Sequence, residues 1–280
     1  MKKILITGSN SYIGTNVEKW LLREPEKYIV ETLDMKDENW NQFDFSGFDV
    51  VFHVAGIAHI KETKRNKDLY YKVNRDLAYQ AALKAKESGV KQFIFLSSMS
   101  VYGMETGIIT KDTTTNPKTA YGRSKLDAEK LIQEIETSEF KVAILRPPMV
   151  YGPDSPGNYQ RLSKLALKLP FYPKINNQRS MLYIDNLSIY IKRYIDSNAH
   201  GIFFPQNKEY VNTTELISLI RKSHGKKCRE TKLFNWMIYL LKPIVLQISK
   251  IFGTLYYQYD EDSICLINFP DSIEMIEKEK

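Results

Sequence analysis

The chain has 280 residues and a net charge of +7, with 43% hydrophobic and 26% charged residues. These values are those of an ordinary soluble globular protein, long enough for a large core and a smaller lobe. The basic balance suits anionic ligands such as nucleotides, and also an acidic membrane face, but no Lys/Arg block is long enough to argue for nucleic acid. The two cysteines, Cys228 and Cys265, exclude a disulfide framework and have no metal-ligand spacing, so we expect a cytoplasmic protein without a metal site.

The N-terminal stretch predicts a strand, a glycine turn and a helix. Its apolar run, Ile4–Ile6, is too short for a signal sequence, so Lys3–Thr7 is interpreted as a strand and Asn16–Arg23 as an amphipathic helix. Between them the spacing G-x-x-G-x-x-G holds Ser11 at its middle position. Such a turn lets the backbone approach a pyrophosphate at a helix N-terminus, and the alternative is a turn without a ligand. The predicted cofactor contacts here are Gly8, Ser11, Tyr12, Ile13 and Gly14.

The second predicted strand, Tyr28–Leu33, ends at Asp34, twenty residues after Gly14. A carboxylate at this distance is placed to bind the adenosine ribose and would repel a 2′-phosphate, which favours NAD over NADP. The alternative is an exposed aspartate in a turn. Asp44 and Phe45 precede the next strand and are predicted to flank the adenine.

The run Asp49–Ala55 is continuously apolar, as in a strand buried on both faces of a parallel sheet. It leads into Gly56, and the small residues there would let a cofactor pass close by, so Val54, Ala55 and Gly56 are predicted cofactor contacts. We interpret His53 as a hydrogen-bonded core residue. His59 and Lys61 lie just past the strand, where a substrate could bind.

Helical and apolar segments continue to alternate up to Leu145. They are a helix over Leu69–Glu87, a strand over Gln92–Leu96, a polar loop over Met104–Lys118, a helix over Ala120–Glu136 and a strand over Lys141–Leu145. This alternation predicts an α/β fold of the Rossmann type, with a doubly wound parallel sheet and ligands at the carboxyl ends of its strands.

Ser98, Tyr121 and Lys125 are the predicted catalytic residues. Tyr121 and Lys125 are four apart, so they share one face of their helix. A neighbouring ammonium lowers the pKa of a phenol, and the Ser98 hydroxyl could hold the substrate oxygen that Tyr121 deprotonates. The alternative for Tyr-x-x-x-Lys alone is a surface tyrosine with a solvated lysine.

After Gly152 the alternation ends. We predict a nucleotide-binding domain over residues 1–152 and a smaller substrate lobe over 153–280, partly interleaved with the first. The lobe is expected to contain helices over Tyr159–Leu169, Asp185–Asp196 and Thr213–His224 and a short strand over Arg179–Ile184.

The segment Leu233–Tyr257 is apolar and aromatic, but Lys242, Pro243 and Lys250 interrupt it, so it is too short between charges to span a membrane. Ser223–Gln258 carries six Lys/Arg and one Glu, which is most of the net charge. One interpretation is a helix pair packed on the lobe; the other is peripheral contact with the inner, anionic membrane face.

Together, seven motifs resemble those of the extended short-chain dehydrogenase/reductases of the NAD-dependent epimerase/dehydratase family. They are TGSNSYIG, Asp34, HVAG, SSMSVYG, YGRSK, LRPPMVYGP and QRSMLYIDN, and they run from the N-terminus to about Asn186. The most similar branch contains UDP-glucose 4-epimerases and reductases of UDP-4-keto-6-deoxyhexosamines.

The resemblance implies a role for each matching residue. Tyr121 would be the catalytic acid and base, Ser98 would bind the sugar hydroxyl, and Lys125 would hold the nicotinamide ribose. Asn74 and Pro148, within Pro147–Val150, would line the cofactor site, and Arg179 would contact the substrate diphosphate. Diphosphates also favour bidentate arginine on chemical grounds.

The sequence departs from the family pattern in three ways: Ser11 replaces a glycine, Met149 replaces an asparagine, and Met99 and Ser100 replace the Asp-Glu pair of sugar dehydratases. Neither Met99 nor Ser100 can do acid–base work at neutral pH, so a dehydratase is disfavoured.

We therefore expect an NAD-dependent oxidoreductase acting at C4 of a UDP-hexose or UDP-hexosamine. A 4-epimerase would pass through a transient 4-keto sugar; a 4-reductase of surface polysaccharide synthesis would perform only the second half, and the sequence leaves this choice and the sugar open. A non-catalytic dinucleotide-binding protein is the further alternative. Nucleic acid is not an expected partner, and by analogy the chain would form a homodimer through Leu69–Glu87 and Ala120–Glu136.

Overall fold

The computed structural model describes residues 1–58, 62–63, 65–233, 235–241, 244–258 and 266–278. The chain divides into two compact units. Unit 1 comprises residues 1–103, 115–147 and 187–205, and unit 2 comprises 104–114, 148–186 and 206–280. The chain thus returns to unit 1 after entering unit 2.

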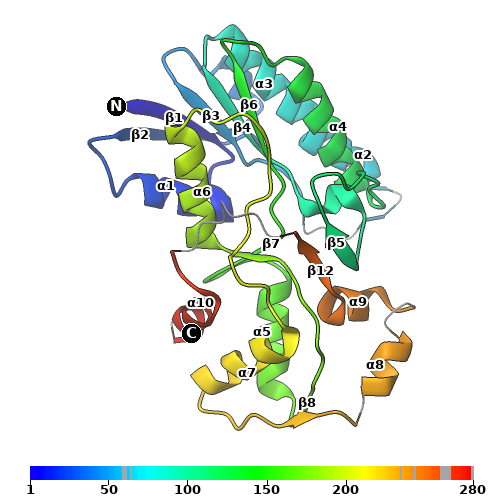
Figure 1. Ribbon diagram of the computed structural model, residues 1–280. Helices are drawn as coiled ribbons and strands as arrows, with labels where there is room; N and C mark the ends of the chain where they lie inside the picture. Colours follow the sequence, from blue (N-terminus) through cyan, green and yellow to red (C-terminus); the bar gives the residue numbers. More distant parts are fainter. Residues whose placement is uncertain (59–61, 64, 234, 242–243, 259–265, 279–280) are drawn as a thin grey trace. The chain divides into compact units, whose positions relative to one another are not determined.

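Unit 1 is built on a six-stranded parallel sheet (Figure 1). Its strands, in spatial order, are β2 (Tyr28–Leu33), β1 (Lys2–Thr7), β3 (Val50–His53), β4 (Gln92–Leu96), β6 (Lys141–Leu145) and β10 (Gly201–Phe203). The strand β3 is fully buried, as its unbroken apolar run predicts. The direction of winding reverses between β1 and β3, so the doubly wound parallel sheet is confirmed.

The helices of unit 1 cover both faces of this sheet (Figure 1). α2 (Lys67–Tyr70), α3 (Leu77–Glu87) and α4 (Ala120–Glu134) lie on one face, and α1 (Tyr12–Leu21) and α6 (Ile184–Asp196) lie on the other. Four buried alanines of α3 pack against alternate residues of the strands; they are Ala78, Ala81, Ala82 and Ala85. Small side chains let the helix lie close to the sheet.

The predicted helix over Leu69–Glu87 is interrupted by a π-helical turn, η2 (Tyr71–Asp76), between α2 and α3. The residue spacing does not predict this π-helical turn. Such turns are rare and are often found at functional sites. The turn carries Asn74, a fully buried polar residue. Two 3-10 turns complete the unit, η1 (Trp40–Gln42) and η3 (Met99–Tyr102).

Unit 2 contains three small parallel strand pairs and short helices. The pairs are β5 (Gly107–Ile109) with β12 (Leu255–Tyr257), β7 (Met149–Tyr151) with β9 (Met181–Tyr183), and β8 (Tyr172–Pro173) with β11 (Glu230–Thr231). The helices are α5 (Asn158–Lys168), α7 (Thr213–Ser223), α8 (Asn235–Leu241), α9 (Leu246–Phe252) and α10 (Phe269–Lys278). The predicted polar loop Met104–Lys118 therefore contains a strand, because β5 finds its partner far along the chain in β12.

A buried carboxylate joins three helices of unit 2. Glu277 on α10 accepts hydrogen bonds from Tyr159 and Ser163 of α5, at 2.8 and 2.9 Å, and its other oxygen lies 2.9 Å from His224 after α7. A buried carboxylate needs such partners, so this cluster holds the last turn of α10 against α5 and the residue that follows α7.

Among the described residues, no helix has both the length and the apolar character to cross a membrane.

Candidate active site

The first glycine turn is shaped by a close approach between two strand ends. Gly8 has φ +119°, and a Cβ there would lie 2.8 Å from the amide nitrogen of Ala55, just after β3. Ser11 is the N-cap of α1, and its hydroxyl accepts a hydrogen bond from the Gly14 amide at 3.2 Å. The serine that departs from the glycine pattern therefore has a local function: it satisfies one of the free amides of the helix N-terminus.

Asp34 follows β2 at the same edge of the sheet. It is exposed, and its carboxylate accepts a hydrogen bond from the Lys36 amide at 2.9 Å, which orients it in the turn. Asp44 is held in a similar way by Ser46, whose hydroxyl and amide lower the pKa of that exposed carboxyl. Phe45 is fully buried in the core, so the structure does not present its side chain to a ligand.

Gly56 and Asn74 meet beyond the end of β3. The Asn74 side chain accepts from the Ile57 amide at 2.8 Å and donates to the Ile57 carbonyl at 3.0 Å and to the Ser124 hydroxyl at 3.2 Å. A Cβ at Gly56 would lie 3.0 Å from Asn74 Oδ1 and 3.2 Å from Lys125 Nζ. The missing side chain of Gly56 thus lets the Asn74 and Lys125 side chains approach this backbone closely.

Ser98 and Tyr121 are brought together by a second close approach. Gly122 has no side chain, and a Cβ there would lie 2.6 Å from the Ser100 carbonyl oxygen in η3. The first turn of α4 can therefore lie against the turn that begins at Ser98. The Ser98 hydroxyl is near enough to the Tyr121 phenol to lower its pKa by hydrogen bonding, although burial outweighs this and raises the pKa of Tyr121 overall.

Lys125 lies one turn after Tyr121 and is almost completely buried. Its ammonium donates to the Leu96 carbonyl at 2.8 Å and lies 4.7 Å from the centre of the Phe95 ring. Burial lowers the pKa of Lys125 to about 8, and the Glu129 carboxylate opposes this shift. Burial is the largest effect on the Tyr121 phenol and raises its pKa, while the lowering by Lys125 expected from the four-residue spacing stays a prediction.

Behind these residues lies a buried ion pair. Arg146, at the end of β6, donates to both carboxylate oxygens of Glu129 on α4, with Nη2 2.6 Å from Oε2 and Nε 3.1 Å from Oε1. The Ser97 hydroxyl also donates to Glu129, and Arg146 donates to the Tyr102 hydroxyl at 2.8 Å. This network connects the residues on both sides of Ser98 to the helix that carries Tyr121 and Lys125.

The sequence analysis did not identify two further residues that lie near Tyr121. Glu62 accepts a hydrogen bond from the Ala120 amide at 2.7 Å, so a carboxylate occupies the N-terminus of α4. The Tyr70 ring meets the Tyr121 ring edge to face, with 6.4 Å between their centres. Neither contact has a local sequence signal, since both join segments about 50 residues apart.

The other predicted contacts are distributed as follows. Val54 and Ala55 are buried directly after β3 in unit 1, whereas Pro148 belongs to unit 2. His53 is a core histidine as expected: it is fully buried, its Nδ1 lies 2.8 Å from the Thr7 hydroxyl, and burial lowers its pKa to about 3. His59 and Lys61 lie outside the described residues.

Arg179, the predicted diphosphate ligand, is in unit 2 and is largely surrounded by backbone. Its Nη1 donates to the Gly253 carbonyl at 2.9 Å and to the Ser249 carbonyl at 3.3 Å, at the end of α9. Burial lowers the pKa of the guanidinium, and Glu105 opposes the shift. The contacts are to neutral oxygens, so the positive charge of Arg179 is not neutralised by them.

The residues of unit 1 fit a nicotinamide dinucleotide. Gly8 and Gly14 carry no side chain beside the first turn of α1, where a phosphate would bind, and that turn has no acidic side chain to repel it. Asp34 follows β2, the position from which a carboxylate would bind a ribose, and Asn74 and Lys125 both lie close to Gly56.

Solved structures share this fold. UDP-glucuronic acid 4-epimerase from Bacillus cereus, in complex with NAD, matches with a TM-score of 0.77 at 21% identity, covering 99% of this chain and 96% of that one. A dTDP-4-dehydrorhamnose reductase from Bacillus anthracis, in complex with NADP, matches with a TM-score of 0.74 at 17% identity and covers both chains completely.

Two curated relatives are similar in sequence. UDP-glucose 4-epimerase from Vibrio cholerae is 31% identical over 92% of this chain and 84% of its own length. N-acetyl-alpha-D-glucosaminyl-diphospho-ditrans,octacis-undecaprenol 4-epimerase from Escherichia coli O157:H7 is 26% identical over 80% of this chain and 73% of its own length.

The family model of the NAD dependent epimerase/dehydratase family matches residues 4–198, which include the glycine turn, Asn74, Ser98, Tyr121 and Lys125. The chain belongs to this family of extended short-chain dehydrogenase/reductases, and it is an NAD-dependent sugar-nucleotide epimerase or reductase.

Proposed function

We propose that the protein is a 4-epimerase of a UDP-hexose or UDP-hexosamine. The observation that carries the proposal is the placement of Ser98 at the start of η3 and of Tyr121 and Lys125 one turn apart on α4, with Lys125 close to Gly56. The similarity to the Vibrio cholerae UDP-glucose 4-epimerase over nearly the whole chain supports it.

In this proposal NAD, when bound, supplies the acceptor and donor for the hydrogen at C4. Tyr121 Oη takes the proton from the sugar O4 during oxidation and returns it during reduction. Ser98 Oγ holds the same oxygen by a hydrogen bond, which fixes its distance from the phenol. Lys125 Nζ supplies a positive charge below its pKa of about 8, and this charge stabilises the phenolate that forms when Tyr121 loses its own proton.

Substrate and cofactor selection would rest on other residues. Arg179, with its charge uncompensated by the carbonyls that it contacts, is proposed to bind the substrate diphosphate. Asp34 is proposed to select NAD by repelling a 2′-phosphate. Replacing Asp34 by Ser should narrow the difference between the dissociation constants of NAD and NADP, and an unchanged ratio would rule out this role.

A 4-reductase of a UDP-4-keto-6-deoxyhexosamine is the second candidate. It is favoured by the motifs RPPMVYGP and QRSMLYIDN, which resemble those of such reductases in particular. A reductase would consume reduced cofactor instead of recycling it.

The experiment separates these candidates. The purified protein is denatured to identify any released dinucleotide, and the native protein is incubated with a panel of UDP-sugars while reduced nicotinamide is followed by absorbance. Interconversion of C4 isomers without net change in the cofactor supports the epimerase. Oxidation of the reduced cofactor only with a 4-keto sugar supports the reductase, and the absence of both signals favours the non-catalytic alternative. A lipid-diphosphate-linked sugar belongs in the panel, because the Escherichia coli relative is named for such a substrate.

A homodimer through the helices of unit 1 is also proposed, by analogy alone. Sedimentation velocity of the wild-type protein measures the mass directly, and a monomer at all concentrations would exclude it.

A further inference from the structure

Exposed apolar side chains gather on one short segment of unit 2. Of the 14 large hydrophobic residues that are exposed in the described part of the chain, six fall within residues 233–244. We call them the α8 surface: Leu233, Trp236, Met237, Tyr239, Leu240 and Ile244. The most exposed are Leu233, Trp236, Leu240 and Ile244, at 69, 68, 61 and 75%. Single exposed apolar residues are normal, but a cluster marks an interaction site.

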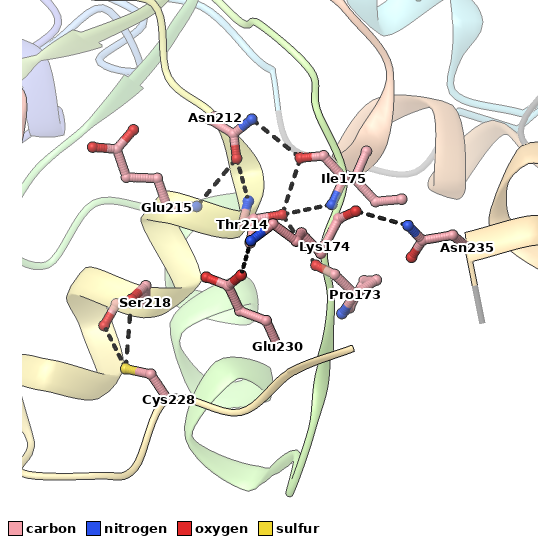
Figure 2. Close-up of polar contacts among 10 residues, drawn as sticks. All are labelled: Pro173, Lys174, Ile175, Asn212, Thr214, Glu215, Ser218, Cys228, Glu230 and Asn235. Carbon is pink, nitrogen blue, oxygen red and sulfur yellow. Dashed lines mark hydrogen bonds and ion pairs between the residues drawn. The ribbon is translucent and has the colours of Figure 1, made fainter. Parts of the chain in front are cut away.

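The α8 surface is not an ordinary helix packed on a core. α8 has seven residues, and Ile238 is the buried one among them. Asn235 connects the helix to a neighbouring segment of unit 2, because its side-chain amide donates to the Lys174 carbonyl at 2.7 Å (Figure 2). Lys174 directly follows β8. Thr214 holds this segment, because its hydroxyl binds the backbone on both sides of Lys174, and the backbone to which Asn235 is bound is therefore itself fixed (Figure 2). The N-terminal residue of α8 is thus held by a hydrogen bond, while the large apolar side chains of the α8 surface stay exposed.

The chain leading into the α8 surface is basic. Four exposed cations precede it within eight residues of its first member; they are Lys226, Lys227, Arg229 and Lys232. The acid of this stretch, Glu230, is already paired with Lys174 at 2.8 Å (Figure 2). Lys226 Nζ contacts the Leu167 carbonyl at 2.8 Å, and the Arg229 guanidinium lies 5.7 Å from the ring of Phe171, another exposed aromatic residue. Within the part of the chain that the structure describes, none of the four cations has an ion-pair partner.

We propose that the α8 surface docks on an anionic lipid bilayer, with its apolar side chains inserted among the acyl chains and the basic residues against the headgroups. Tryptophan and tyrosine favour this interface, and lysine and arginine beside it are attracted to anionic lipids. A second copy of the chain fits less well, because a symmetric contact through this face would bring like charges together. The helix lies on the bilayer in this arrangement and does not cross it. The inference is independent of the proposed function.

Flotation with lipid vesicles tests the docking. Wild-type protein at low salt should float with vesicles containing phosphatidylglycerol and much less with pure phosphatidylcholine. The double variant Trp236→Ser/Leu240→Ser should lose about tenfold or more of the binding, because its apolar insertion is removed. Both residues are exposed, so the fold should be kept, which circular dichroism and thermal unfolding verify. The control is Leu22→Ser/Met275→Ser, which removes two exposed apolar side chains elsewhere, 47 and 42% exposed, and should bind as the wild type does.

Intrinsic fluorescence adds a second readout. Binding should shift the emission of Trp236 to shorter wavelength, and the shift should disappear in Trp236→Phe, which retains Trp20 and Trp40. The proposal is overturned if wild type does not float with anionic vesicles at low salt, or if the Trp236→Ser/Leu240→Ser variant floats as well as wild type. A wild-type dimer that this variant converts to a monomer, without vesicle binding, would show that the surface is an interface between copies.

Discussion

At the scale of single residues, the chemistry depends on Tyr121 being held in place by its surroundings. The Tyr121 ring contacts the Tyr70 ring edge to face, and the amide of the preceding Ala120 donates to Glu62. The Ser98 hydroxyl is near enough to lower the pKa of the phenol. A phenol whose pKa is raised by burial gives up its proton only when a substrate or a positive charge compensates. We therefore expect Tyr121 to lose its proton when a substrate or a positive charge lies beside it.

Replacing Tyr121 by Phe should reduce turnover by about 10²- to 10⁴-fold, because it removes the proton acceptor and donor and leaves the ring packing intact. NAD binding should change little. Steady-state kinetics and a dinucleotide titration measure both effects. Tyr79→Phe is the matched control, since it removes a hydroxyl from a partly buried tyrosine of α3. Near wild-type turnover in Tyr121→Phe would remove this residue from the mechanism.

Lys125 should produce a pH dependence in the alkaline range. Burial lowers its pKa to about 8, so the ammonium is present below that pH and is lost as the pH rises through it. Activity that needs the cation should therefore fall above about pH 8. In Lys125→Arg the side chain stays charged, so the decline should move to higher pH even if the maximal rate drops. The pH profile of kcat provides the test, and the same alkaline limb in both proteins would assign it to another group.

At the scale of elements, the meeting of α4 and η3 depends on a missing side chain. Gly122→Ala would add a Cβ 2.6 Å from the Ser100 carbonyl, and backbone cannot move aside cheaply. Alanine is the better helix former by about 1 kcal/mol, yet overpacking costs about 1–3 kcal/mol, so we expect a net loss of stability. Turnover should fall further than stability suggests, because Ser98 and Tyr121 separate.

Lys130→Ala, on the exposed side of the same helix, is the control for Gly122→Ala and should be close to neutral. Chemical unfolding and kcat are measured for both variants. If Gly122→Ala is as stable and as active as the wild type, the close approach does not organise the site.

The Glu129–Arg146 pair should be a large contributor to the stability of unit 1. Glu129→Gln leaves a buried guanidinium without its counter-charge, which costs about 3–5 kcal/mol. The exposed pair Lys174–Glu230 provides the comparison, since Glu230→Gln should cost less than about 1 kcal/mol. Urea unfolding gives both values. The double variant Glu129→Gln/Arg146→Met should recover part of the loss, and equal costs in Glu129→Gln and Glu230→Gln would contradict the argument.

The sequence predicted the elements whose signals are local. The strands Gln92–Leu96 and Lys141–Leu145 have the bounds expected from their apolar runs, because strands buried on both faces need no partner information to be recognised. The edge strand Tyr28–Leu33 also has the expected bounds, although most of it is accessible to solvent. The π-turn at Asn74 and the pairing of β5 with β12 were not predicted, since both depend on contacts with distant segments. For the same reason the residues that position Tyr121, such as Glu62 and Glu129, could not be read from spacing alone.

At the scale of the whole molecule, the two units contain different parts of the proposed reaction. Unit 1 holds Ser98, Tyr121, Lys125 and the predicted dinucleotide contacts other than Pro148. Unit 2 holds Arg179 and the α8 surface, together with all the basic residues that follow Ser223. The family match over residues 4–198 consists mostly of residues of the first unit.

The most direct test of the account follows the hydrogen at C4. A UDP-sugar that the protein interconverts is prepared with deuterium at C4, and the isomer formed in ordinary water is analysed by mass spectrometry and proton NMR. Transient oxidation at C4 predicts that the isomer keeps its deuterium, with no net change in reduced nicotinamide and no product from Tyr121→Phe. Loss of the label to solvent would contradict the account, because C4 would then be inverted by proton exchange and not by oxidation and reduction.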